Sequence, residues 1–178
     1  MHPNHTTRRP RGTPAAALVL VAAAAALAAC VPPTGGGSGP TTPTFRHGRC
    51  AGTEGVTIVV DLAAFDGTVV VRCALGTQSS GFTTLADAGF TTDPGRHPGT
   101  VCQLNGLPSQ GHPYCWTTGG YWTYWKAPAA GQPWTYSEWG PGAGPAPAPG
   151  AVEGWRFVLF SAGPAVPPRV GTSGPIVP

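Results

Sequence analysis

Val56-Thr57-Ile58-Val59-Val60-Asp61 and, after it, Thr68-Val69-Val70-Val71-Arg72-Cys73 are the segments that decide the fold of this chain. β-branched residues dominate both segments, and such residues favour strands. Between them stands Asp66-Gly67, a dipeptide typical of the tight turn that joins two antiparallel strands. The sequence therefore predicts a β-hairpin over residues 56–73, with a sheet built outward from it.

Residues 79–90 change from a strand pattern to a helical one. Ser79 or Ser80 can cap a helix N-terminus, and Gly89 stands where the glycine that ends a helix is usually found. The apolar residues at helical spacing are Phe82, Leu85, Ala86 and, at the end, Phe90. One short helix is predicted here.

Strand patterns return after this helix. A second hairpin is expected from Phe90–Thr92 and Thr100–Leu104, and further strands are expected at Tyr121–Lys126, Trp134–Trp139 and Val152–Phe160. The segment 141–150 is almost wholly Pro, Gly and Ala and predicts a wide irregular loop. This order of elements predicts an α+β domain in which one mixed or antiparallel sheet carries one short helix.

The first 30 residues have the parts of an export signal. Three arginines precede an apolar run from Ala15 to Ala29, which is shorter than the roughly 20 residues that span a bilayer and predicts a signal peptide. Leu27-Ala28-Ala29-Cys30 resembles the lipobox of bacterial lipoproteins, in which the signal is cut before the cysteine and the thiol is acylated. An ordinary cleaved signal, leaving Cys30 as an odd thiol, is the alternative.

The composition divides the chain into four parts. We expect a signal peptide at 1–29, a flexible spacer at 30–45, one domain at 46–161 and a Pro- and Gly-rich tail at 162–178. Lipid on Cys30 would anchor the protein to the extracytoplasmic face of the bacterial cell membrane. The tail is expected to lie loosely on the surface or in solution, because its prolines prevent regular structure.

Four cysteines remain after the expected lipidation site, an even number in a chain bound for an oxidising compartment. Cys102 and Cys115 flank a segment that predicts a tight turn, so we expect a disulfide between them and a second one between Cys50 and Cys73. A zinc site at Cys102, His112 and Cys115 is the competing interpretation. It has only half of the usual paired ligand spacing, and no metal is expected.

Charge and motifs argue against several function classes. The chain has ten Lys and Arg against seven Asp and Glu, but three arginines belong to the signal, which leaves seven of each sign. Nucleic-acid binders show a basic patch, so nucleic acid is not expected as a partner. The sequence has no serine-hydrolase elbow, zinc-protease motif or phosphate-binding loop, and nothing pairs Glu138 with Glu153 as in a glycosidase. We expect no enzymatic activity and no resident cofactor.

All six tryptophans and all four tyrosines lie within residues 114–155. Strand alternation places their rings on defined faces of the predicted strands. One face can be core, and the other would leave exposed rings of the kind that mark binding sites. The same rings also serve to fill the core of a small sheet, and the sequence alone favours neither interpretation. The candidate ligand-binding residues are Trp122, Tyr124, Trp134, Tyr136 and Trp155.

Four segments in this order resemble the transcobalamin-like C-terminal β-grasp domain of bacterial surface proteins. They are Val56–Asp61, Leu104-Asn105-Gly106, Tyr121-Trp122-Thr123-Tyr124-Trp125 and Gly150–Phe157. The resemblance covers about residues 56–160 and implies a β-grasp fold. It also implies a corrinoid as ligand, since in transcobalamin proteins this domain closes over one side of a corrinoid and a helical barrel supplies the other side.

The chain departs from that pattern because it has no helical barrel, a wide loop at 141–150 and no histidine that the pattern would nominate for cobalt. The implied fold is therefore better supported than the implied ligand. Two functions remain open. One is a lipid-anchored module that captures a corrinoid or another small cofactor for an uptake-system protein, and the other is a structural or interaction lipoprotein with no small ligand.

Overall fold

The computed structural model of this protein describes residues 43–176. The expected signal peptide at 1–29, the expected lipidation site Cys30 and most of the expected spacer lie outside the described residues. Within the described range, no helix is both long enough and apolar enough to span a membrane.

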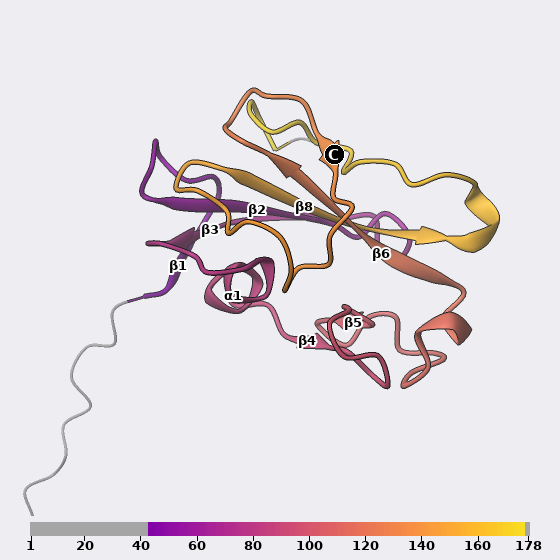
Figure 1. Ribbon diagram of the computed structural model, residues 1–178. Helices are drawn as coiled ribbons and strands as arrows, with labels where there is room; N and C mark the ends of the chain where they lie inside the picture. The colour runs from indigo at the N-terminus through magenta and orange to yellow at the C-terminus, as the bar shows by residue number, and fades with distance from the viewer. Residues whose placement is uncertain (1–42, 177–178) are drawn as a thin grey trace, which may run out of the picture. The chain divides into compact units, whose positions relative to one another are not determined.

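One six-stranded sheet forms the centre of the domain (Figure 1). In spatial order its strands are β1 (Phe45–His47), β3 (Val69–Leu75), β2 (Gly55–Asp61), β8 (Val152–Leu159), β6 (Gly120–Ala127) and β7 (Thr135–Tyr136). β2 and β8 run parallel, with Thr57 opposite Val152, and the other neighbouring pairs are antiparallel. The sheet is therefore mixed, and with one short helix the domain has the predicted α+β character.

The predicted hairpin is the pair β2 and β3, in which Val59 lies opposite Val71. Its turn is stabilised locally, because the Asp66 carboxylate accepts hydrogen bonds from the backbone and hydroxyl of Thr68. Strand β1 pairs with the outer edge of β3. No strand was predicted at β1, because three residues are too few to show a strand pattern, and its first residue, Phe45, falls in the predicted flexible spacer at 30–45.

The single α-helix of the described range is α1 (Gly81–Asp87). Ser80 caps its N-terminus, because its side chain accepts a hydrogen bond from the Thr83 backbone N–H. In return the Thr83 hydroxyl oxygen accepts a hydrogen bond from the Ser80 backbone N–H. Gly89 follows the helix with a positive φ of 75°, where it ends the helix as predicted.

A small lobe connects α1 to β6. It contains β4 (Thr92–Asp93) and β5 (Gln103–Leu104), which pair antiparallel, and the 3₁₀ turn η1 (Cys115–Thr117). This is the second predicted hairpin, but its strands are much shorter than expected. A further 3₁₀ turn, η2 (Phe160–Ala162), follows β8.

Both predicted disulfides are present. Cys50 is joined to Cys73, which ties the segment before β2 to strand β3, and Cys102 is joined to Cys115, which closes the small lobe.

Each face of the sheet carries its own apolar core. The face that packs against α1 contains Ile58, Val60, Ala74, Leu85, Ala88, Phe90, Leu104, Trp122, Tyr124, Trp155 and Phe157. The opposite face, called the back face from here on, contains Val59, Val71, Ala127, Val152 and Val170. Figure 1 shows α1 on one side of the sheet and the yellow C-terminal segment on the other.

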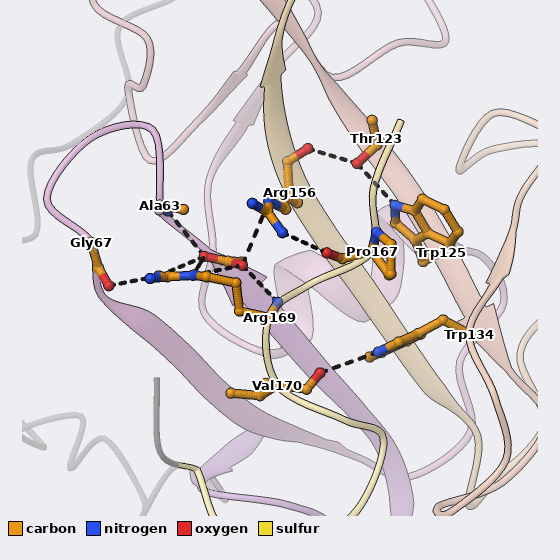
Figure 2. Close-up of polar contacts among 10 residues, drawn as sticks. Ala63, Gly67, Thr123, Trp125, Trp134, Arg156, Pro167, Arg169 and Val170 are labelled. Carbon is orange, nitrogen blue, oxygen red and sulfur yellow. Dashed lines mark hydrogen bonds and ion pairs between the residues drawn. The ribbon is translucent and has the colours of Figure 1, made fainter. Parts of the chain in front are cut away.

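The C-terminal segment differs from the expected loose tail, because it is held on the back face by specific contacts (Figure 2). The carboxylate of Asp61 is fully buried and accepts hydrogen bonds from the backbone and guanidinium of Arg169. The indole of Trp134 donates to the carbonyl of Val170, and Arg156 donates to that of Pro167. A proline-rich segment without regular structure thus forms an ordered layer over the sheet.

Candidate functional site: an aromatic cleft beside strand β6

The five aromatic residues proposed from the sequence do not share one face. Trp122, Tyr124 and Trp155 point toward α1 and are only 7%, 5% and 1% exposed. Trp134 lies on the back face beneath the C-terminal segment. Tyr136 is 38% exposed and packs edge-on against Trp125. For the first three residues the structure favours the core interpretation over an exposed binding face.

Four of these five residues nevertheless reach one cleft. A cavity of about 360 Å³ lies beside β6, between the small lobe and the segment after β7, and Trp122, Tyr124, Tyr136 and Trp155 contribute to its lining. Sites for small ligands typically measure about 300–1,000 Å³, so this cavity is at the lower end of that range. We call it the aromatic cleft.

Two further tryptophans line the aromatic cleft and were not nominated from the sequence. Trp116 is 58% exposed and Trp139 is 62% exposed. Trp116 belongs to η1, directly after the disulfide at Cys115, and its ring meets His97 edge-on with 4.5 Å between centroids. Trp116 lies where no strand was predicted. Trp139 ends the predicted strand Trp134–Trp139, of which the structure keeps only Thr135–Tyr136 as β7. Their high exposure makes them the best candidates to contact a ligand.

The main-chain groups of Trp122, a residue that lines the cleft, point to the outer edge of β6. The backbone N–H of Phe160 donates to the carbonyl of Gly119, so Gly119 and every second residue after it direct their main-chain groups toward β8. Ser137 donates to the carbonyl of Tyr124 on the other edge. Trp122 is two residues from Tyr124 on the same strand, so its N–H and C=O also point away from β8.

No strand pairs with Trp122 on that outer edge in the described part of the chain. β7 pairs only with Trp125 and Lys126, and the chain leaves the edge after Ser137. The next carbonyl on this edge, that of Gly120, accepts from the hydroxyl of Thr118. The main-chain groups of Trp122 are thus without a hydrogen-bond partner in residues 43–176, although the residue is buried.

A buried polar pair, Tyr124 and Glu153, lies at the floor of the cleft. Tyr124 donates its hydroxyl to Oε1 of Glu153, whose pKa is raised because the carboxyl is buried. Burial, together with the neighbouring Glu153, also raises the pKa of Tyr124.

The rim of the cleft carries one formal charge. Among its lining residues, Glu138 is the only Asp, Glu, Lys or Arg. Burial raises the pKa of the nearby Tyr136, with smaller contributions from Tyr121 and Glu138. The cleft thus combines aromatic walls with a single acidic group.

Other groups in the described range show no catalytic arrangement. His112 lies 3.2 Å from the Asp93 carboxylate, which is half exposed on the small lobe. The ligand atoms of Cys50, Glu54 and Cys73 lie within 4.8 Å of one another, but the disulfide occupies both sulfurs. These groups give no reason to place chemistry outside the aromatic cleft.

The aromatic cleft is the feature of the described residues best suited to hold a ligand, because it joins exposed rings to unpaired main-chain groups. Comparison with protein-family models, with curated proteins and with solved structures found no significant match for this chain.

Proposed function

We propose that this protein is a lipid-anchored extracytoplasmic lipoprotein of bacteria whose domain is a non-catalytic module that binds a small ligand in the aromatic cleft. The observation that carries the binding proposal is the pair of exposed tryptophans, Trp116 and Trp139, at one cavity. Large aromatic side chains are costly to expose and are enriched where proteins bind ligands.

We also assign the domain to the β-grasp class. This assignment is supported by an N-terminal hairpin, a single helix on one face and a last long strand, β8, placed in parallel beside β2 in one mixed sheet. A corrinoid or another planar cofactor, passed on to an uptake-system protein, is the ligand that the resemblance implies.

The ligand proposal is tested by titrating the domain with hydroxocobalamin while recording tryptophan fluorescence. We expect saturable quenching beyond the inner-filter effect, and weaker binding in the Trp116→Ala and Trp139→Ala variants. Phe160→Ala is the matched control, because Phe160 is 55% exposed but does not line the cleft. Equal binding by all three variants would mean that the ligand binds outside the cleft. A titration without saturation would exclude a corrinoid as the ligand.

The anchoring proposal is tested with Cys30→Ser. Each buried CH₂ of an acyl chain contributes about 0.8 kcal/mol to membrane binding, so we expect the variant to move from the membrane fraction to the soluble one. Membrane retention of the variant after a high-salt wash would contradict lipidation at Cys30.

A second candidate function, an interaction lipoprotein with no small ligand, is favoured by a different surface. Tyr121 and Phe160 stack with 5.8 Å between ring centroids, and they are 36% and 55% exposed. Leu159, the last residue of β8 and the direct neighbour of Phe160, is also 45% exposed. If Phe160→Ala abolished capture of an envelope protein while Trp116→Ala did not, this second function would take precedence.

A further inference from the structure

We infer that the ligand of the aromatic cleft is a short, extended, basic peptide that adds to the free edge of β6. This inference rests on the proposed function, since it names the ligand class of the same site. It starts from the main chain of Trp122 rather than from the aromatic rings.

Buried backbone N–H and C=O groups are almost always paired. Trp122 lines the cleft and is 7% exposed, and its N–H and C=O point to the outer edge of β6 and have no partner within the described residues. Both groups point to the same side of β6. In an antiparallel pair, a residue in this orientation exchanges two hydrogen bonds with one residue of the neighbouring strand. An extended peptide supplies the complementary C=O and N–H, as in other cases of strand addition.

The pairing of β7 with β6 shows why the position is open. Tyr124 lies opposite Ser137, and continuing that register would bring residue 139 opposite Trp122. The chain turns away instead, and four residues after Ser137 the carbonyl of Pro141 accepts a hydrogen bond from the backbone of Gly81 before α1. The place that a longer β7 would fill is occupied by the cleft.

The charge of the peptide is argued from the rim. Glu138 is the single charged lining residue, and Trp116 and Trp139 present exposed rings beside it. A Lys or Arg side chain on the peptide would pair with the carboxylate and lie over an indole ring. An acidic peptide would meet like charge.

The test uses the domain with both disulfides intact and three capped pentapeptides of sequence Val-Lys-Val-Lys-Val. One is unmodified, one carries N-methyl groups on its first, third and fifth residues, and one carries them on its second and fourth. N-methylation removes the donor N–H, so strand addition requires one methylated peptide to bind like the unmodified one and the other to lose about tenfold or more in affinity. Calorimetry measures the affinities.

A second measurement locates the pairing. The backbone amide of Trp122 should exchange with solvent deuterium at least several-fold more slowly when the unmodified peptide is bound, as followed by NMR. The amide of Tyr121, which faces β8, is the internal reference and should not change. Glu138→Gln should weaken binding of the basic peptide, and Phe160→Ala should leave it unchanged.

The outcomes separate this inference from the proposed function. Equal binding of both methylated peptides, or an unchanged exchange rate at Trp122, would overturn strand addition and leave the cleft as a binding site. Saturable binding of hydroxocobalamin with no binding of any peptide would also overturn the inference and keep the proposed function. If neither probe binds, both are wrong.

Discussion

The two faces of the sheet are covered in different ways. The face toward α1 is closed by packing, with the rings of Tyr124 and Trp155 stacked 4.5 Å apart among aliphatic side chains. The back face has a smaller apolar core and is closed by a segment without regular structure, which the Asp61 and Arg169 pair holds in place. The comparison shows that a coil can serve as a protein layer when a buried charge positions it.

The largest effect is expected where packing alone closes the sheet. Trp155→Ala should lower the free energy of unfolding by about 3–5 kcal/mol, since it empties the centre of a core in which Trp155 is 1% exposed. Urea denaturation measures the loss. Trp134→Ala on the back face is the matched variant and should cost less, because Trp134 is only partly buried. Equal losses of unfolding free energy in the two variants would contradict the view that packing matters more on the face toward α1 than on the back face.

The next effect tests the charge on the back face. Arg169→Leu should lower the free energy of unfolding by less than Trp155→Ala does, because the fully buried Asp61 carboxylate loses its closest cationic partner while Arg156 remains 3.7 Å away. Limited proteolysis should then cut within residues 163–176. Arg96→Leu, at an exposed site in the small lobe, is the control and should stay within about 0.5 kcal/mol of the parent. A variant whose tail stayed protected would show that apolar contacts suffice.

The smallest effect concerns pH and the packed face. Burial raises the pKa of Glu153 above its usual 4.5. A raised folded-state pKa means that the contribution of this group is fully present below pH 4.5 and is lost as the pH rises through the folded-state value. The stability of Glu153→Gln relative to the parent should therefore increase as the pH is raised from about 4.5 toward neutral. Denaturation of both proteins across this range measures it.

The stability of the parent at each pH must be subtracted from that of Glu153→Gln, because other acidic groups change the stability of both proteins with pH in the opposite direction. Backbone hydrogen bonds lower the pKa of Glu54, Asp66 and Asp93, so their contributions are lost as the pH falls. A difference curve that stayed flat would mean that Glu153 has no special role in the packed face.

The sequence predicted those parts of the fold that short-range patterns determine. The β2 and β3 hairpin, the Ser80 cap, Gly89 at the end of α1 and both disulfides follow from residues close to one another or from turn chemistry. The ordered tail could not be predicted, because its fixed point joins Asp61 to Arg169 over 108 positions. Composition indicated only that the tail lacks regular structure.

The candidate site was predicted in part for a similar reason. Strand alternation located Trp122, Tyr124 and Trp155 but could not say that all three are buried. Trp116 and Trp139, the two most exposed tryptophans of the cleft, lie outside regular strands in the structure, and the strand predicted at Trp134–Trp139 is shorter than expected and does not reach Trp139. The free edge at Trp122 depends on where β7 ends, and the sequence pattern predicted a longer strand there than the structure has.

The parallel pairing of β2 with β8 also has a consequence for how the chain assembles. Thr57 leaves the ribosome long before its partner Val152, so β2 and β3 are complete while the inner edge of β2 still lacks its neighbour. An unpaired edge rich in valine and isoleucine is a template for wrong association, and pairings between distant segments form slowly. This edge of β2 stays unpaired until the last long strand reaches it, and a truncation before β8 would leave it permanently open.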